Sequence, residues 1–134
     1  MNSFVSVLLV AAVALAGVCA LTEEQVKKAD GFAAECLTKF EGLTKEAVGK
    51  LRAGEFENVD KNQKCFVKCF LERAGFMDAE GNLQEDYMIE RLSLDREKSK
   101  VEALVKKCSE KKDDACETAF AAFECYYNGK ASLF

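Results

Sequence analysis

Histidine is absent from this 134-residue chain. Its absence removes the general base of histidine-dependent catalytic triads and the histidine-aspartate arrangement of secreted phospholipases. The carboxylate pair Asp113-Asp114 is more typical of a helix start than of acid-base catalysis. No Cys-x-x-Cys motif is present either, which argues against a zinc site. We therefore expect no enzymatic activity, no metal and no cofactor.

Proline is absent as well, and no run of alternating β-branched residues is long enough to form a convincing strand. Apolar residues instead recur at helical spacing along most of the chain. The sequence predicts an all-α fold, a compact bundle of about six helices. They are expected over residues 22–39, 44–54, 60–75, 83–92, from 95 through 108, and 113–127.

Several of these helices carry recognisable start and stop signals. Asp60 with Gln63 three residues later predicts a capping box, and Thr44 is a good N-cap for the short second helix. Gly75 is a natural left-handed stop, and Asn128-Gly129 is expected to end the last helix in the same way. The last helix is apolar nearly all round, which is typical of a buried helix around which a bundle is built.

Basic residues are not in excess, since 19 Lys and Arg face 23 Asp and Glu for a net charge of -4. A nucleic-acid partner would need a basic face, so none is expected. The same net charge weakens an antimicrobial role, which requires attraction to anionic membranes.

The first twenty residues carry no charged side chain, and Val18 and Ala20 occupy the small-residue positions of a cleavage site. This pattern predicts a secretory signal peptide over 1–20, although no Lys or Arg precedes the apolar run. A membrane anchor would need flanking charges, so we expect no stable membrane insertion. The predicted mature chain, 21–134, is one extracellular domain.

Seven cysteines are present, and Cys19 falls in the predicted signal peptide. The remaining six predict three disulfides in a secreted protein. Cys65 and Cys69 share one helix face and should reach different partners, whereas Cys116 and Cys125 leave the last helix on opposite sides. Spacing alone still allows fifteen pairings, and proximity would favour Cys108 with Cys116.

The order of the six cysteines, the C-x3-C spacing in the third helix, the C-x8-C spacing in the last helix and the signal peptide resemble the insect odorant-binding proteins, in particular the general-odorant and pheromone-binding group. The resemblance covers the whole predicted mature chain. It implies interlocked pairs, which replace the proximity argument: Cys36–Cys69, Cys65–Cys116 and Cys108–Cys125. It also implies that the helices enclose an apolar cavity.

The function implied by the resemblance is that of a secreted carrier, which binds odorants, pheromones or similar small hydrophobic molecules and transports them to chemosensory receptors. A chemosensory receptor is then a further partner, and a monomer or weak dimer is expected. Aromatic, Met and Leu side chains on or near the predicted helices are candidates for the cavity lining. They are Phe66, Phe70, Phe76, Met77, Tyr87, Met88, Leu92, Leu104, Phe120, Phe123, Tyr127 and Phe134.

Each of these residues can also be explained as ordinary core, and the cavity is favoured only for the group as a whole. Four hydroxyls are candidate ligand anchors, although a surface or structural hydrogen bond is the more common role for each of them: Tyr87, Ser93, Thr118 and Tyr126. The C-terminal residues Leu133 and Phe134 are a candidate lid. Without histidine, ligand affinity should depend weakly on pH between about pH 5 and pH 7.

A second class of function remains open from the sequence. A secreted, disulfide-stapled bundle can act through its surface in signalling or defence, without a ligand cavity. Such a protein would have a solid core and an exposed apolar patch. A carrier would instead enclose a void.

Overall fold

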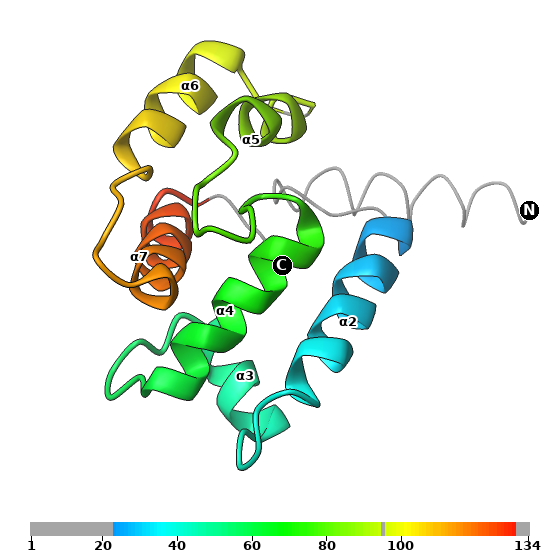
Figure 1. Ribbon diagram of the computed structural model, residues 1–134. Helices are drawn as coiled ribbons and strands as arrows, with labels where there is room; N and C mark the ends of the chain where they lie inside the picture. The colour runs from blue at the N-terminus through cyan, green and yellow to red at the C-terminus, as the bar shows by residue number, and fades with distance from the viewer. Residues whose placement is uncertain (1–22, 95, 131–134) are drawn as a thin grey trace, which may run out of the picture.

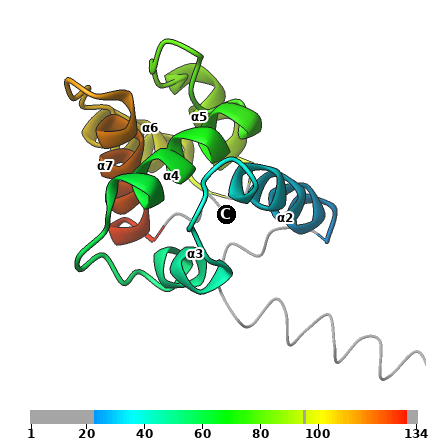
Figure 2. The same cartoon turned by 60° about the horizontal axis from the view of Figure 1, so that its bottom comes forward.

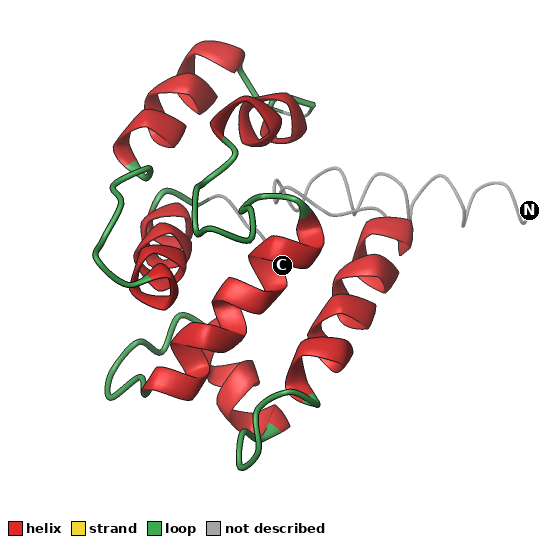
Figure 3. Ribbon diagram, in the orientation of Figure 1, coloured by secondary structure: helices red, strands yellow, loops and turns green. Residues whose placement is uncertain are grey.

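The structure is a computed structural model that describes residues 23–94 and 96–130. This part of the chain contains six α-helices and no strand, so the predicted all-helical bundle is confirmed (Figures 1 and 3). A single antiparallel bridge joins Met77 to Leu83. The helices are α2 (Glu23–Leu37), α3 (Lys45–Arg52), α4 (Lys61–Ala74), α5 (Glu85–Leu92), α6 (Lys98–Lys107) and α7 (Ala115–Asn128). The predicted signal peptide and the capping residue Thr22 lie outside the described residues.

Helix α4 occupies the middle of the arrangement. It packs against α7 on one side and α2 on the other, and α3 contacts it near its start (Figures 1 and 2). Helices α5 and α6 pack against each other. The bundle is therefore organised around α4 and α7.

The predicted caps of α3 and α4 are confirmed. Thr44 Oγ1 accepts a hydrogen bond from the backbone N–H of Ala47, at 3.1 Å. Asp60 and Gln63 form the reciprocal capping box, and Gly75 ends α4 with a left-handed φ of 86°. These signals act over one helical turn, so they can be read from sequence.

The predicted left-handed stop at Gly129 is wrong. Gly129 has a φ of -82°, and the positive φ of 60° occurs at Lys130. A Cβ at position 129 would lie 2.6 Å from Cδ1 of Leu104. A larger residue at this position would displace the Leu104 side chain of α6, and the backbone conformation of Gly129 is an ordinary one.

Other helix boundaries also differ from the sequence prediction, and α6, expected from residue 95, begins at Lys98. Helix α5 begins at Glu85 because Leu83 bridges to Met77, and the N–H of Gln84 donates to the carbonyl of Phe76 at 2.8 Å. Helix α2 ends at Leu37, and a turn follows. The last helix has Asp114 as its N-cap, since its carboxylate accepts from two backbone N–H groups of the first turn.

The core lies between α4 and α7. Four residues of α4 and four of α7 are almost completely buried: Phe66, Val67, Phe70, Leu71, Ala119, Ala122, Phe123 and Tyr126. The prediction that the last helix is buried on most sides agrees with this arrangement. Burial of so much aromatic and aliphatic surface makes this pair of helices the main source of stability.

Three disulfides join elements that are distant in sequence. Cys36–Cys69 ties α2 to α4, Cys65–Cys116 ties α4 to α7, and Cys108–Cys125 ties the end of α6 to α7. These are the three pairs implied by the family resemblance. The loops that they close overlap, so the helices are linked in the order α2, α4, α7, α6.

None of the helices in the described residues is long and apolar enough to cross a membrane.

Candidate functional site

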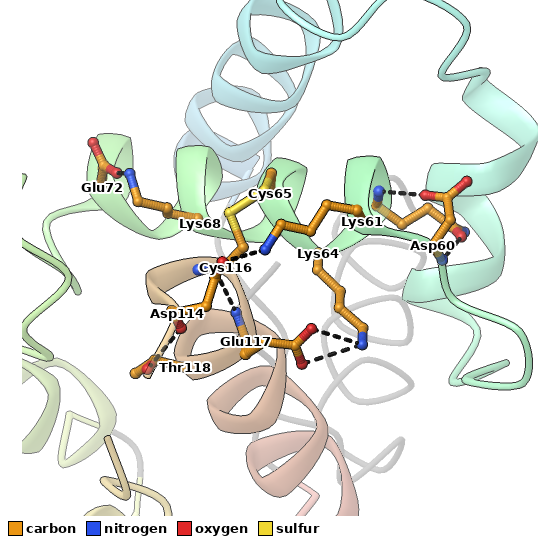
Figure 4. Close-up of a disulfide and its surroundings, with 11 residues drawn as sticks. Asp60, Lys61, Lys64, Cys65, Lys68, Glu72, Asp114, Cys116, Glu117 and Thr118 are labelled. Atoms are coloured by element: carbon orange, nitrogen blue, oxygen red, sulfur yellow. Dashed lines mark hydrogen bonds and ion pairs between the residues drawn. A yellow bond between two sulfur atoms is a disulfide. The ribbon is translucent and has the colours of Figure 1, made fainter. Parts of the chain in front are cut away.

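Figure 4 shows the contact between α4 and α7 around the disulfide Cys65–Cys116. Lys61 on α4 pairs with Asp114, the N-cap of α7. One turn further along, Lys64 Nζ lies 3.0 Å from a carboxylate oxygen of Glu117. Exposed ion pairs contribute at most about 1 kcal/mol each. Together with the disulfide, these two ion pairs join the first two turns of α4 to the first turn of α7.

The carboxylate of Asp114 combines two roles at this contact. It accepts the ammonium of Lys61 and the N–H groups of Cys116 and Glu117. The Lys61 hydrogen bond, followed by that of the Cys116 N–H, lowers the pKa of Asp114 below its ordinary value of 3.8. The group is therefore ionised at neutral pH and fixes the first turn of α7.

An aromatic cluster lies on the other half of α7. The ring of Phe56, in the loop between α3 and α4, makes edge-on contacts with Phe120, Phe123 and Tyr127, at centroid distances of 5.7, 5.8 and 5.4 Å. The Tyr127 hydroxyl donates to the carbonyl of Ala53 at 3.0 Å. Three of the predicted lining residues thus form one cluster, and a loop residue completes it.

The predicted lining residues fall into three groups by burial. Tyr87 and Tyr127 are exposed, at 39% and 41% of their surface. Phe134 lies outside the described residues, together with Leu133 and the predicted lid. The others are buried (Phe66, Phe70, Phe76, Met77, Met88 and Phe123) or half-buried (Leu92, Leu104 and Phe120).

Two of these residues lie away from the aromatic cluster on α7. Phe76 and Tyr87 pack on each other between the end of α4 and α5, with ring centroids 5.6 Å apart. The Tyr87 ring also lies about 3.4 Å from the position that a Cβ would take at Gly75. The contact holds α5 to the end of α4. The assignment of any of these residues to a ligand-binding surface remains a prediction.

The candidate hydroxyl anchors differ in their hydrogen bonding. Thr118 Oγ1 accepts from the N–H of Lys112 at 2.8 Å and donates to backbone carbonyls, so it is occupied structurally. Tyr126 is fully buried and directs its hydroxyl at the sulfur of Met88, 3.6 Å away. Burial raises the pKa of Tyr126, so its phenol stays protonated as a donor. The Ser93 hydroxyl is buried and has no partner among the described residues.

Helix α2 presents an apolar face that sequence reasoning did not include in the candidate site. Ala29, Phe32, Ala33 and Leu37 are half-buried, and Cys36 is the only buried residue of the helix. Phe32 meets Phe70 of α4 edge to face, with centroids 6.1 Å apart. The helical spacing of these residues was the available signal. It identifies an amphipathic helix but does not reveal that the apolar face is incompletely covered.

Three hollows open to solvent on the described surface. One of about 720 Å³ lies along α4 and is lined by two disulfides, Lys68 and Arg73. A second, of about 740 Å³, lies between α3 and the loop that carries Phe56. A third, of about 600 Å³, lies between α5 and α6 beside Leu94. Among the described residues, no three His, Cys, Asp or Glu side chains are grouped to hold a metal ion.

Comparison with known proteins gives consistent results. Residues 19–129 match the model of the PBP/GOBP family. Odorant-binding protein 10 of Aedes aegypti is 30% identical over 110 residues, which cover 81% of this chain and 78% of the relative. General odorant-binding protein 56a of Drosophila melanogaster is 32% identical over 111 residues, which cover 82% of this chain and 78% of the relative.

Solved structures show the same fold. A fatty acid binding protein from the oral disk of the blowfly Phormia regina superposes with a TM-score of 0.70 at 37% identity, covering 83% of this chain and 96% of that one. Odorant binding protein 5 of Apis mellifera gives 0.67 at 24% identity, covering 86% and 98%. The second likeness concerns the fold alone.

Proposed function

The chain belongs to the PBP/GOBP family of insect odorant-binding proteins, and from this premise we propose that it is a carrier of small hydrophobic molecules. The ligand is held inside the bundle against apolar side chains of α2, α4 and α7. The carrier takes the ligand from the surrounding fluid and releases it at a chemosensory receptor. It works as a monomer or weak dimer.

The observation that carries this proposal is the apolar face of α2. Ala29, Phe32 and Ala33 are only half-buried although α2 packs along α4 and is tied to it by a disulfide. Apolar surface of this kind is costly in water, and an apolar ligand between α2 and the α4–α7 pair would cover it. A helix that only packed against its neighbours would bury more of its apolar face.

The ligand class that we favour is a long apolar chain with one polar end, such as a fatty acid or fatty alcohol. The blowfly relative, 37% identical to this chain, is described as a fatty acid binding protein. The buried side chains of α4 and α7 are aromatic and aliphatic, which suits a hydrocarbon chain. The buried phenol of Tyr126, whose hydroxyl lies 3.6 Å from the sulfur of Met88, is a hydrogen-bond donor suited to a carbonyl or carboxylate.

Secretion is part of the same proposal. The uncharged segment 1–20 acts as a signal peptide, and cleavage after Ala20 releases 21–134 as the mature domain. An extracellular location agrees with three disulfides in a small domain. The relatives are named odorant-binding proteins, which favours a ligand-binding function over a surface-acting signalling or defence protein and over catalysis.

The test uses the full-length sequence expressed in a secreting insect cell line. The secreted, oxidised protein is titrated with an apolar fluorescent reporter, which is then displaced by alcohols, esters and fatty acids of graded length. We expect saturable one-to-one binding at micromolar concentration with an optimum of chain length. The amino-terminal sequence of the secreted protein tests cleavage after Ala20. A folded protein without free thiols that binds none of the probes would overturn the carrier proposal.

A matched pair of variants tests the role of α2. Phe32→Ala removes a ring from the proposed ligand surface, and we expect weaker binding by about fifteenfold, the loss expected from about two buried methylene groups. Phe40→Ala removes the same ring from the connection between α2 and α3, where Phe40 lines the outer hollow along α4. Equal affinities for the two variants would remove α2 from the binding surface.

A further inference from the structure

Phe56 lies in the loop between α3 and α4, far from α7 in sequence, yet one side of its ring packs against α7. Its edge-on contacts reach Phe120, Phe123 and Tyr127 within 6 Å between centroids. Phe123 is buried and belongs to the core, whereas Phe56 itself is half-buried. The ring of Phe56 therefore covers the inner aromatic residues of α7 from outside.

The loop that carries Phe56 is held in place at its base. Tyr127 donates its hydroxyl to the carbonyl of Ala53, and the ring of Tyr127 lies over Gly54. A Cβ at Gly54 would lie 2.4 Å from that ring, and the φ of Gly54 is 80°, so glycine is needed here for two reasons. Tyr127 thus fixes the position of the loop through one hydrogen bond and one close contact.

The other side of Phe56 faces solvent. Phe56 lines the hollow of about 740 Å³ between α3 and the loop. The remaining lining is mainly polar and includes Glu46, Lys50, Glu57 and Gln63. The side chain of Phe56 therefore lines this solvent-open hollow on one side and contacts the aromatic cluster on α7 on the other.

From this placement we propose that Phe56 is the end wall of the ligand-binding space and limits the length of the ligand that the protein accepts. The inference rests on the proposed carrier function and adds a specificity-determining residue to it. An apolar chain that lies along α7 meets the ring of Phe56 at this end. Tyr127 acts as a positioning residue, because it holds the loop that presents the ring.

The physical basis is volume. Well-packed apolar sites tolerate ligands that fit and reject those that require rings to move. Removal of the Phe56 ring would connect the α7 aromatic residues with the hollow outside, which leaves room for additional methylene groups. Each methylene group that becomes buried raises affinity about fourfold.

The experiment compares the secreted wild-type protein with Phe56→Ala, using displacement by two series, saturated fatty acids and saturated alcohols of increasing length. In Phe56→Ala the optimum should move up by about two carbons or more, with about a fifteenfold gain for the longer chains relative to wild type. Ligands shorter than the wild-type optimum should lose affinity or stay unchanged. Phe40→Ala is the matched control, since Phe40 is also half-buried in a connecting loop but lines the outer hollow along α4. Its optimum should equal that of wild type.

Two further variants keep the inference testable if Phe56→Ala folds poorly. Phe56→Leu retains an apolar side chain and should shift the optimum in the same direction by a smaller amount. Tyr127→Phe removes only the hydroxyl that holds Ala53. It should release ligands about threefold faster or more in stopped-flow measurements, a change expected from the loss of one modest hydrogen bond.

The outcomes separate the two proposals. Wild-type protein that binds no apolar ligand contradicts the carrier function. Wild-type protein that binds with a length optimum, together with folded Phe56→Ala or Phe56→Leu that keeps the same optimum, contradicts the end wall alone. An equal shift in Phe40→Ala would also contradict it, because the effect would then be general to loss of a ring. Unchanged release rates in Tyr127→Phe would remove the positioning role of Tyr127.

Discussion

Helices α2 and α7 are similar in length, and both are tied to α4 by a disulfide, but their surroundings differ. Helix α7 buries six of its 14 residues and is joined to two other parts of the bundle by Cys116 and Cys125. Helix α2 buries Cys36 alone among its 15 residues. A disulfide to α4 therefore holds a largely buried helix in the case of α7 and a largely exposed helix in the case of α2.

This difference in burial indicates that the contacts of α7 mainly determine stability, whereas those of α2 mainly affect the proposed ligand binding. Contacts of α7 are made mostly within the core, where burial of apolar surface dominates the free energy of folding. Among the described residues, the contacts of α2 outside its disulfide include Phe32 with Phe70, Arg73 with Glu35 and Arg52 with Asp30. We expect perturbations of α7 to change the stability of the whole protein, and perturbations of α2 to act locally.

The largest expected effect is loss of the disulfide between α4 and α7. The double substitution Cys65→Ala/Cys116→Ala opens a loop with a sequence separation of 51. It should lower the free energy of unfolding by about 4 kcal/mol, measured by urea denaturation of the oxidised protein. Hydrogen exchange should speed up throughout α4 and α7.

The corresponding change at α2, Cys36→Ala/Cys69→Ala, is the control for that experiment. Its sequence separation of 33 predicts a similar entropic loss, so total stability alone does not distinguish the two. We expect faster hydrogen exchange mainly in α2, while α7 keeps its protection. Loss of protection in α7 to the same degree would show that the two helices are not independent.

Matched deletions of a ring give the next effect. Phe123→Ala on α7 should lower the free energy of unfolding by about 3 kcal/mol, because the side chain is 3% exposed and its removal leaves a cavity. Phe32→Ala on α2 should cost about 1 kcal/mol, because this ring is only half-buried. Thermal or urea unfolding of both variants measures the difference. Equal losses would contradict the description of α2 as an incompletely covered helix.

A smaller effect is expected at the end of α7. Tyr127→Phe removes the hydrogen bond to the Ala53 carbonyl and should lower the free energy of unfolding by about 1 kcal/mol. Tyr87→Phe removes a hydroxyl for which the described residues provide no hydrogen-bond partner, so its stability should match that of wild type. A loss of stability in Tyr87→Phe equal to that in Tyr127→Phe would argue against a stabilising role of the hydrogen bond from Tyr127 to the Ala53 carbonyl.

The smallest effect concerns pH and separates the start of α7 from the rest. The pKa of Asp114 is lowered in the folded state, chiefly by Lys61, so its contribution to stability is fully present above the ordinary value of 3.8. That contribution is lost as pH falls below 3.8 toward the folded-state pKa. Between about pH 5 and pH 7 stability and affinity should be nearly constant, since the chain has no histidine.

Asp114→Asn tests the assignment, because the amide cannot ionise but can still accept the backbone N–H bonds. Its acid unfolding should begin from a lower stability and show a shallower dependence on pH below about pH 4 than wild type. A steep change of wild-type affinity between pH 5 and pH 7 would contradict the pH prediction.

Sequence reasoning succeeded for helix ends whose hydrogen bonds lie within one helical turn. The capping box of Asp60 and Gln63, the N-cap of Thr44 and the stop at Gly75 are local, and each lies where the sequence predicts it. The stop predicted at Gly129 is wrong because the left-handed conformation occurs at Lys130, and the close contact of Gly129 is with Leu104 on another helix, which local sequence does not reveal. The sequence predicts a helix from Leu83, which is wrong. The bridge from Leu83 to Met77 forms only because the turn between them brings the two residues together, and helical periodicity does not reveal this.

The candidate site was less accessible to sequence reasoning. Aromatic spacing identified Phe120, Phe123 and Tyr127 as one face of the last helix, and their shared contact with Phe56 supports that grouping. Phe56 itself was not identified, because its neighbours are distant in sequence and its loop has no periodic pattern. Spacing likewise left the disulfide pairing open, and the family resemblance was needed to choose among the alternatives.

The overlapping disulfides have a further consequence for a protein exposed to proteases. The spans 36–69, 65–116 and 108–125 together leave no peptide bond between Cys36 and Cys125 outside a disulfide loop. A single proteolytic cut anywhere in that range therefore yields two chains that remain covalently joined. The nicked molecule would separate into fragments only after reduction, and until then its helices stay tethered close enough to re-form their contacts.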